Sequence, residues 1–457
     1  MDRNYQSFKE QMDALVEAKN YRAIRPIADG MPKADIAEYL SGLEISKALP
    51  VFRTLPKELA ADVFSYLETD VQEKFITSIT DDEIKRIIEE LSTDDAVDML
   101  EELPASIVKR VLKNASADTR SEINRFLNYS DSTVGSIMTS EFTNLKSTMT
   151  VAEAIDYVRR VGSEKETIYT CFVISQSRVL EGVLELCDIL KCRDDSATVG
   201  ELMDVNVIKV TTSDDKEDAA KLFSKYDLVS LPVVDSENRL VGIVTVDDIM
   251  DVIEEEATKD IEQMAAMQHI ETPYLKTGIM TLVKSRLPWL FVLMLAGMIN
   301  GAILGGFEEA IAAIPLLVTF MPMLTDTGGN SGAQATTTVI RGLTTGDLMP
   351  NDVLRILWKE VRVATVVGVI FAAVNFLRIV LMTNDPDRVL IGITVSVAMI
   401  FTILLAKSLG AVLPVLVQKL HLDPAVVAAP MITTVVDAVA LTVYFKLAMT
   451  LLSSRLG

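Results

Sequence analysis

The sequence predicts a multidomain protein with an all-α helical repeat domain, an α/β module built from two copies, and an α-helical membrane domain of five segments. Three observations support this prediction. Short amphipathic blocks repeat through residues 1–130, one longer pattern occurs twice between residues 131 and 254, and every apolar segment long enough for a bilayer follows residue 286. A length of 457 residues also suits about three domains.

The charge of the chain lies in its first 286 residues. The formal net charge is −21 at pH 7, and acidic and basic residues are equal in number from residue 287 onward. A strongly acidic soluble part argues against nucleic acid as a partner, because nucleic acid binds basic surfaces. An acidic surface suits either simple solvation or the binding of cations, and composition leaves both readings open.

The three cysteines, Cys171, Cys187 and Cys192, show no spacing typical of a metal site. Reduced thiols in a cytosolic domain are the simplest explanation for them. The N-terminal residues are polar and no apolar core follows them, which predicts no cleavable signal peptide.

Residues 1–130 are expected to form short helices throughout, stacked into an array, because helices this short cannot bury their apolar faces alone. Thr80 with Glu83 and Thr69 with Gln72 match the capping-box signature of a helix start. No catalytic chemistry is visible here, so a docking or regulatory role is expected. The blocks are LPKELAADVFSYL, TDVQEKFITSI, TDDEIKRIIEEL, STDDAVDMLEEL, PASIVKRVLKNA and SADTRSEINRFL.

Residues 131–195 and 196–254 carry two copies of one pattern: a short helix ending in Met, a strand, a capped helix, two β-branched strands and a closing helix. With the motif VGIVTVDDI, this pattern resembles a pair of CBS domains, which form one sensor module and commonly dimerise. The resemblance implies that Thr245, Asp247 and Asp248 contact the ribose of a nucleotide such as ATP. Capping of the last helix by the two aspartates is the alternative.

Residues 255–285 are expected to form an acidic helix that connects the soluble part to the membrane domain. An acidic run begins just before them, and Asp247, Asp251, Glu254 and Glu255 share one helix face, with Glu256 beside it. Such a run is either a solvated face or a cation site, and its place directly before the membrane favours a cation sensor. The stretch KTGIMTLVKSRLP then predicts an amphipathic helix along the cytoplasmic interface.

Residues 286–457 are expected to hold five membrane segments. Lys and Arg residues flank them in a pattern that places the N-terminal domains in the cytoplasm and the C-terminus outside, as in a multi-pass protein of the plasma membrane. The second segment is broken by TDTGGNSG, and the fourth is interrupted by Lys407, Ser408, Gly410 and Pro414. The segments are 287–306, 311–340, 357–382, 389–417 and 425–451.

The break in the second segment gathers small and polar residues. Non-helical, glycine-rich backbone at membrane depth is tolerated only inside protein or beside water, which predicts a pore lining. Close helix packing on small residues is the alternative explanation for the glycines, and both can hold together. The candidate pore-lining residues in this segment are Asp326, Gly328, Gly329, Asn330 and Gln334.

The last segment carries a single carboxylate, Asp437, with Thr433 and Thr434 one turn before it. A charged Asp at the bilayer centre costs about 3 kcal/mol on insertion scales, so it usually faces a partner, water or an ion. We therefore expect Asp437 and Thr433 to hold a cation and Thr434 to line its path.

The order of domains, with the motifs GGNSGAQATTTVIRG, VDDIMDVIEEEATKDI and ITTVVDAVALTVYF, resembles the MgtE family of magnesium channels and transporters over nearly the whole chain. The resemblance implies a transporter rather than an enzyme, working as a homodimer with one pore, and Mg²⁺ held near a pair of Asp437 carboxylates. It also implies closure by cytosolic Mg²⁺ bound between the soluble domains and the connecting helix. Asp94, Asp95 and Asp98 are the candidate ligands in the N-terminal domain.

Two departures from the family pattern bear on ion choice, because Ala333 and Ala429 stand where the family often has polar residues. Transport of another divalent cation, such as Mn²⁺ or Co²⁺, and a membrane Mg²⁺ sensor without transport are the alternatives. An anion channel is disfavoured by Asp437. An intramembrane metalloprotease would need HExxH, whereas His269 and His421 stand alone.

Overall fold

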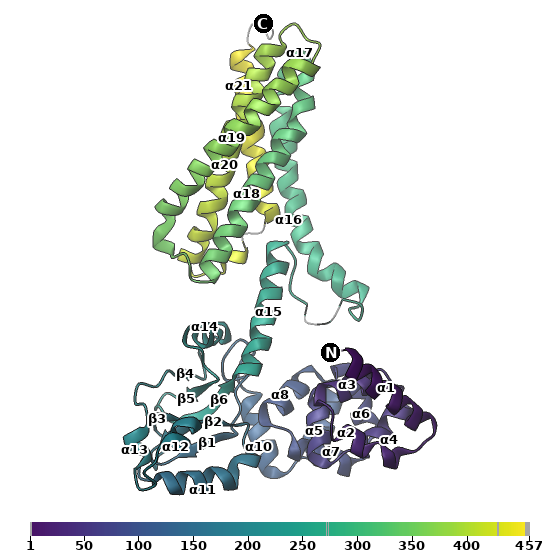
Figure 1. Ribbon diagram of the computed structural model, residues 1–457. Coiled ribbons are helices and arrows are strands. Elements are labelled where there is room, and N and C mark those ends of the chain that lie inside the picture. Colours follow the sequence, from purple (N-terminus) through teal and green to yellow (C-terminus); the bar gives the residue numbers. More distant parts are fainter. Residues whose placement is uncertain (1, 271, 273, 427–428, 453–457) are drawn as a thin grey trace. The chain divides into compact units, whose positions relative to one another are not determined.

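The computed structural model describes residues 2–270, 272, 274–426 and 429–452 (Figure 1). The chain separates into two compact units, Met1–Ile253 and Glu254–Gly457. Each unit contains hydrophobic clusters of its own.

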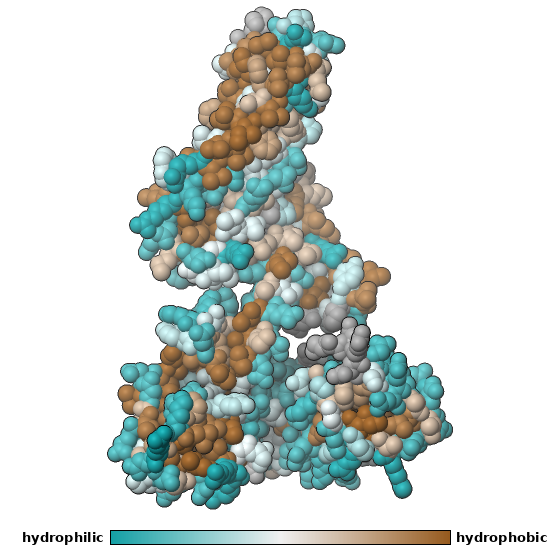
Figure 2. Space-filling view, in the orientation of Figure 1, coloured by the Kyte–Doolittle hydropathy of each residue, from teal (hydrophilic) through white to brown (hydrophobic). Residues whose placement is uncertain are grey.

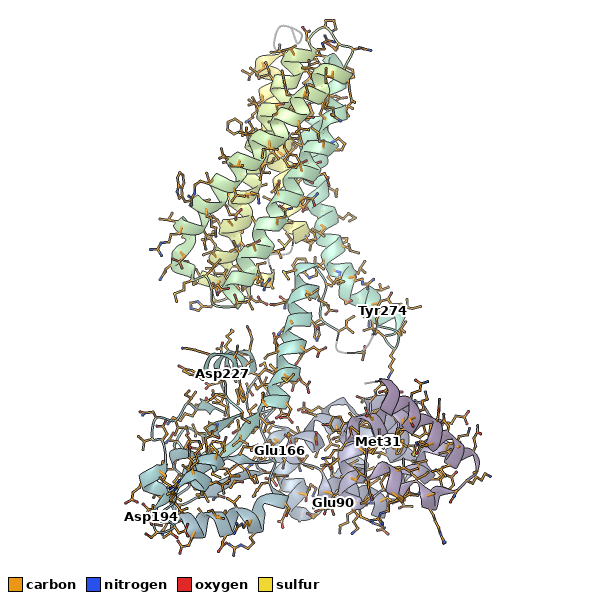
Figure 3. All side chains as sticks on the ribbon, viewed as in Figure 1. Met31, Glu90, Glu166, Asp194, Asp227 and Tyr274 are labelled. Carbon is orange, nitrogen blue, oxygen red and sulfur yellow. The ribbon has the colours of Figure 1, made fainter. Side chains whose placement is uncertain are left out.

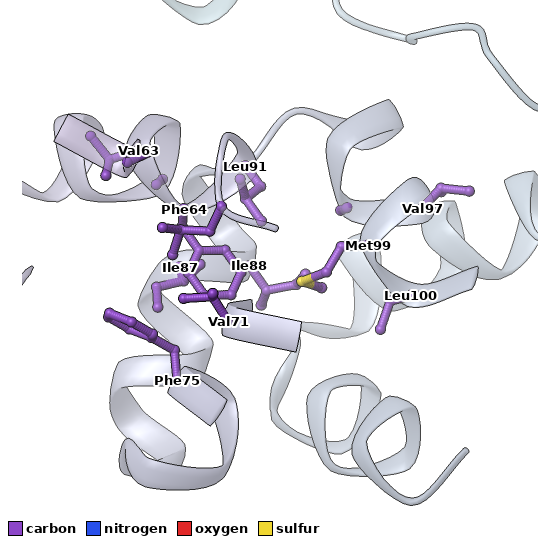
Figure 4. Packing of buried hydrophobic residues seen from close by; sticks show 14 of the residues in the cluster. Val63, Phe64, Val71, Phe75, Ile87, Ile88, Leu91, Val97, Met99 and Leu100 are labelled. Atoms are coloured by element: carbon purple, nitrogen blue, oxygen red, sulfur yellow. The ribbon is translucent and has the colours of Figure 1, made fainter. Parts of the chain in front are cut away.

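The first unit begins with short helices, as the repeated blocks predict. Their apolar faces meet in one core in which Phe64, Phe75, Ile87, Ile88 and Met99 pack side by side (Figure 4). Each helix is too short to bury this surface by itself, so stacking stabilises the array. The helices are α1 (Asp2–Glu17), α2 (Arg25–Ala28), α3 (Lys33–Ser41), α4 (Ile45–Phe52), α5 (Lys57–Ser65), α6 (Thr69–Ser78), α7 (Asp81–Glu90), α8 (Thr93–Glu102), α9 (Ala105–Asn114) and α10 (Ala117–Phe126).

One of the two predicted capping boxes forms. The Thr80 side chain accepts a hydrogen bond from the Glu83 backbone N–H, and the Glu83 carboxylate accepts one from the Thr80 N–H. The box expected at Thr69 is wrong, because Glu68 is the N-cap and Thr69 is already the first residue of α6. The Gln72 amide turns instead to the carbonyl of Phe64, 3.1 Å away, and is buried there.

The rest of the first unit is the duplicated α/β module. In each copy two neighbouring strands run parallel and the last two pair antiparallel, in the orders β1-β2-β3 and β4-β5-β6. Backbone bridges from Thr139 to Ile243 and from Val183 to Asp204 tie the copies into one module. The elements are β1 (Phe142–Leu145), α11 (Val151–Val161), β2 (Thr167–Ile174), β3 (Leu180–Glu185), α12 (Leu186–Lys191), α13 (Val199–Leu202), β4 (Val210–Thr211), α14 (Lys216–Tyr226), β5 (Ser230–Val234) and β6 (Leu240–Thr245).

The short helix expected at the start of each copy forms only in the second copy, as α13. A capping box between Thr198 and Glu201 supports that helix. The matching residue of the first copy is Ser136, whose hydroxyl donates to the Thr133 carbonyl 2.9 Å away, and the stretch before Met138 is a series of turns. A serine is too short to reach back as the glutamate does, so this box is missing.

Helix α15 (Val246–Met264) follows β6 and is continuous, so the acidic residues keep their helical spacing. The connecting helix expected over 255–285 is too long, because α15 ends at Met264 and the next helix begins at Ile279. The second unit then consists of helices. These are α16 (Ile279–Gly305), α17 (Glu308–Ala313), α18 (Met321–Thr344), α19 (Val353–Met382), α20 (Arg388–Lys419) and α21 (Ala429–Leu451), with 3₁₀ turns at Pro315–Phe320, Pro350–Asp352 and Pro424–Val426.

Four helical stretches of the described chain are long and apolar enough to cross a membrane: Ile279–Gly305, Pro350–Met382, Arg388–Lys419 and Pro430–Leu451. Figure 2 shows broad hydrophobic surface over the helices of this unit, and α16 exposes large side chains such as Leu290, Phe291 and Leu295. Helix α18 lies among them as the fifth, but its polar residues keep it out of the apolar group.

Three expectations about this unit are wrong. The TDTGGNSG stretch does not break its segment, because α18 runs unbroken from Met321 to Thr344. The fourth segment is likewise one helix, with Pro414 inside it. The amphipathic helix expected along the interface belongs to α16, which starts at Ile279 and continues through Pro288.

Candidate functional site

The glycines of α18 lie at its contacts with α20 and α21. A Cβ added to Gly328 would lie 2.6 Å from Cγ2 of Thr402 on α20 and 2.9 Å from Cγ1 of Val436 on α21. One added to Gly329 would lie 2.6 Å from Cγ2 of Thr433. Close packing therefore outweighs the low helix propensity of glycine and keeps α18 helical. Gly328 and Gly329 are buried at this contact and do not share the exposed face of α18.

The exposed face of α18 is polar. Asp326, Asn330 and Gln334 recur at the spacing of one helical turn and are exposed, and the same face continues to Thr337, Thr338 and Arg341. Asn330 Nδ2 donates a hydrogen bond to Asp326 Oδ1 over 3.1 Å. A carboxylate and amides facing lipid would be costly, so this face fits a neighbouring protein surface or water better than acyl chains. Ala333 is half-buried and adds no polar group to it.

Asp437 lies on α21, which packs against α18. Its Oδ1 atom is buried and has no hydrogen-bond partner among the described residues. The Thr434 hydroxyl donates to the Pro430 carbonyl over 2.9 Å, so its proton is used within the helix while its lone pairs remain for a ligand. The side chain of Ala429 lies outside the described part of the chain.

A second group of carboxylates lies in the first unit, where the helical repeat meets the α/β module. Asp94 on α8 is only 6% exposed, and its Oδ1 atom has no hydrogen-bond partner within the described part of the chain. Burial and the nearby Asp247 carboxylate raise the pKa of Asp94. A buried carboxylate oxygen without a donor is unfavourable, and a cation would relieve it.

Glu141 and Glu166 belong to this group, and the sequence alone did not single them out. Burial and repulsion from Asp94 raise the pKa of Glu141 to about 7. Burial and repulsion from Asp94 and Asp247 raise the pKa of Glu166, which is labelled in Figure 3, to about 7. Because the Glu166 side chain is exposed and stays hydrated, we assign more of its shift to repulsion. Asp95 is exposed beside Asp94, and Asp98 is exposed one turn further along α8.

Thr245, Asp247 and Asp248 stand at the start of α15. The Thr245 hydroxyl lies 2.5 Å from Asp247 Oδ1 and 2.6 Å from Asp248 Oδ2, and its single proton can serve only one of them at a time. Burial and repulsion from Asp94 raise the pKa of Asp248 to about 8. Asp248 also accepts a 3.4 Å contact from the Thr245 N–H, so it caps the helix as the alternative reading expects.

Further along α15, Asp251 and Glu254 are exposed and Glu255 is half-buried. Glu256 accepts an ion pair from Lys259 Nζ over 3.0 Å. Among the described residues of the whole chain, no group of three His, Cys, Asp or Glu side chains stands at distances suited to a bare metal ion. The described acidic side chains therefore form no closed ligand cage.

These features define a class: a membrane protein with a polar, carboxylate-bearing face among its apolar helices and an acidic α/β module before them. Family models match three parts of the chain: "Divalent cation transporter" at residues 321–447, "MgtE intracellular N domain" at 31–132 and "CBS domain" at 199–255. The magnesium transporter MgtE of Thermus thermophilus is 35% identical over 97% of this chain and 98% of its own length. The chain belongs to the MgtE family, whose members are transporters and not enzymes.

Other relatives agree with this assignment. The magnesium transporter MgtE of Bacillus subtilis is 31% identical over 92% of this chain and 89% of its own length. A crystal structure of the cytosolic domain of the Mg²⁺ channel MgtE in complex with ATP covers 53% of this chain and 99% of its own, at 33% identity and a TM-score of 0.51. The soluble part of a magnesium transporter covers 55% of this chain and 99% of its own, at 29% identity and a TM-score of 0.53.

Proposed function

We propose that this chain carries Mg²⁺ across the plasma membrane through a pore formed by two copies, and that cytosolic Mg²⁺ closes the pore. One observation carries the proposal: α18 exposes a polar face at membrane depth, and the Asp437 carboxylate beside it has an oxygen without a partner in the described chain. Relatives that cover nearly the whole chain are named magnesium transporters, which supports Mg²⁺ as the ion.

A second copy of the chain supplies what one copy lacks. The Asp326–Asn330–Gln334 face is exposed in a single chain, and a two-fold axis along it would turn two such faces toward each other. The polar groups would then line water instead of lipid. Two Asp437 carboxylates, one from each copy, would face the same path.

The chemistry of this path suits Mg²⁺. The ion dehydrates reluctantly and is bound by one or two carboxylates while it keeps several waters. A pair of Asp437 carboxylates supplies the charge, and the Thr433 and Thr434 hydroxyls supply oxygen atoms for the water shell. The helical backbone of α18 uses its carbonyls internally, so side chains and water do the coordination.

Closure would arise at the acidic group around Asp94 and along α15. Mg²⁺ between Asp94 and Asp247 would neutralise carboxylates that now repel one another. An ion that binds one arrangement of the soluble part better than another shifts the population toward it. The acidic residues of α15, namely Asp251, Glu254, Glu255 and Glu256, would couple this ion to the membrane helices, with the N-terminal domains in the cytoplasm.

Two further points belong to this proposal. A relative's cytosolic domain binds ATP, and Thr245 with Asp248 would contact the ribose if the same module binds a nucleotide here, at the cost of the cap that they now form.

Mn²⁺ and Co²⁺ are the alternative substrates, because Ala333 and Ala429 supply no polar group where the family often has one. A Mg²⁺ sensor without transport would have no use for Asp437.

The Asp437→Ala variant tests the proposal. Cells that lack other Mg²⁺ importers should lose uptake with this variant, while the amount of protein in the membrane stays as in the wild type. Asp347→Asn is the control, since Asp347 is an exposed carboxylate in the loop after α18. Normal uptake by Asp437→Ala would refute the pore assignment and leave the sensor alternative. If the variant loses uptake, the flux of Mg²⁺, Mn²⁺, Co²⁺ and Ca²⁺ into liposomes that contain the wild-type chain would rank the ions.

A further inference from the structure

We propose that Asp326 is a second carboxylate of the ion path, level with Asp437, and that it sets the preference among divalent cations. This inference rests on the proposed function, because it assigns a role to Asp326 inside the same pore. It goes further in one respect: the path would hold carboxylates in two helices of each copy, with charge for more than one divalent cation.

The helix contacts place Asp326 opposite Asp437. A Cβ on Gly332 would meet Ile432, and one on Gly328, four residues earlier in α18, would meet Val436, four residues later in α21. The two helices therefore run antiparallel. Stepping back along α18 from this register, residue 326 falls level with residues 437 and 438 of α21.

The helix faces agree with this register. Gly329 contacts Thr433 across the same interface. Asp326 lies one helical turn before Gly329 in α18, and Asp437 lies one turn after Thr433 in α21. One turn back on α18 and one turn forward on α21 thus bring the two carboxylates to the same level.

The polar contacts fit a role in the path. Asp326 is exposed on the same face as Gln334, and Asn330 Nδ2 donates to its Oδ1, which orients the carboxylate and leaves Oδ2 for water or an ion. At the same level of adjacent helices, the Asp326 and Asp437 carboxylates repel each other. Two repelling carboxylates at membrane depth are costly unless cations occupy the space between them.

Charge arithmetic then argues for more than one ion. A two-fold axis doubles the Asp326–Asp437 pair to four carboxylates, whose charge exceeds that of a single divalent cation. The remaining negative charge would attract a second ion, and repulsion between neighbouring ions helps each to leave, as in other channels with several sites. A pore with Asp437 alone would be neutralised by one ion.

Ion preference follows from coordination chemistry. Mg²⁺ needs one or two carboxylates and keeps its waters, whereas Ca²⁺ accepts six to eight oxygen ligands in flexible geometry, including several carboxylates. Adding Asp326 therefore favours Ca²⁺ more than Mg²⁺. We expect Ca²⁺ to compete strongly for this path and to block the flux of Mg²⁺.

The test uses the purified full-length chain in liposomes that contain a Mg²⁺-sensitive dye, with external Ca²⁺ titrated against Mg²⁺ influx. Asp326→Asn should raise the Ca²⁺ concentration for half-inhibition about tenfold, which corresponds to about 1.4 kcal/mol of binding. Asp326→Glu, which keeps the carboxylate, should retain block close to that of the wild type. The control Asp347→Asn makes the same change in the loop after α18 and should leave block unchanged.

The outcomes separate this inference from the proposed function. Unchanged Ca²⁺ block in Asp326→Asn, with Asp437→Ala inactive, would overturn the role of Asp326 and leave the pore intact. An active Asp437→Ala would refute the pore itself. If Asp326→Asn carries no flux, Asp326→Glu decides: recovery of flux together with Ca²⁺ block supports the second carboxylate, and failure to recover overturns it.

Discussion

The ammonium group of Lys407 on α20 lies 3.4 Å from the carboxylate of Glu360 on α19, and protein covers both side chains. Lys407 is only 5% exposed, in the middle of a helix that is mostly apolar. Its neighbour Ala406 places a backbone carbonyl 3.4 Å from where a Cβ of Gly332 would lie on α18. The ion pair therefore joins α19 to the stretch of α20 that supports α18.

Neutralising one partner of this pair should destabilise the membrane unit more than neutralising both. Glu360→Gln or Lys407→Met alone leaves an unpaired buried charge, at a cost of about 3 kcal/mol. The double variant removes both charges and should recover most of the loss. Thermal unfolding of the four purified chains in detergent gives the coupling free energy. Equal and additive effects of the two single changes would show that the pair is not coupled.

The glycine contact of α18 predicts a position-dependent effect of one substitution. Gly328→Ala adds a Cβ that would lie 2.6 Å from Thr402, which forces α18 away from α20 and α21 and should reduce Mg²⁺ influx at least about tenfold. Gly297→Ala on α16 is the matched control, because nothing lies within 4 Å of its Cβ in the described chain. That control should keep flux and gain a little helix stability. Similar flux in both variants would contradict close packing as the reason for the glycine.

Sequence periodicity was a reliable guide to the soluble fold. Ile84, Ile87 and Ile88 follow helical spacing and are buried in α7, and the duplicated pattern gives two sheets of the same strand order. The glycines of α18 wrongly predict a break in the helix. Low helix propensity is a local signal, whereas the contact with Thr402 that offsets it depends on another helix. Local sequence signals thus predict most helices and strands, but they do not predict where contacts with another helix outweigh a residue's own propensity.

The candidate site residues also fall into two kinds: those that a local pattern indicates, and those that only the fold brings together. Asp437 is a candidate that the sequence alone indicates, because a single carboxylate in an apolar segment is visible without a structure. The sequence does not indicate Glu141 and Glu166, because the fold alone brings them close enough to Asp94 for repulsion and they have no local motif. Lys407 was visible as an interruption of its segment, yet its partner Glu360 lies on another helix. Relations between elements far apart in sequence require the fold.

The acidic group around Asp94 predicts a stability that falls as pH rises. Carboxyl groups of unfolded chains have pKa values of about 4, whereas the pKa of Glu141 is about 7 and that of Asp248 about 8. The folded state therefore holds more protons than the unfolded state between these limits. The stability that these groups contribute is fully present below pH of about 4 and is lost as pH rises through about 7 to 8.

Mg²⁺ should restore this stability where protons no longer do. Thermal unfolding of residues 1–264 without metal should show a lower Tm at high pH than at low pH, and Mg²⁺ should raise the Tm more at high pH. Asp94→Asn should reduce both effects, whereas Asp118→Asn, an exposed carboxylate of α10, should leave them intact. The same dependence on pH and Mg²⁺ in Asp94→Asn as in the wild type would contradict a cation site at this group.

The last prediction concerns the proposed gating by Mg²⁺ at the carboxylates of α15. Asp251→Asn, Glu255→Gln and Glu256→Gln together remove three charges from a helix whose Lys259 already pairs with Glu256. If Mg²⁺ on these carboxylates favours the closed arrangement, the internal Mg²⁺ concentration for half-inhibition should rise about tenfold, because the ion loses its differential affinity for the closed state. Flux from liposomes with defined internal Mg²⁺ measures this value.

A loss of charge at the cytosolic part could itself change the local concentration of Mg²⁺, so the control must match it. Glu10→Gln, Asp156→Asn and Glu237→Gln together remove the same charge from exposed surface sites. Both triple variants change the net charge by the same amount, and attraction over more than about 10 Å is screened at ordinary salt. Weakened inhibition in the α15 variant alone supports a bound ion, and equal inhibition in both would reduce the acidic run of α15 to a solvated face.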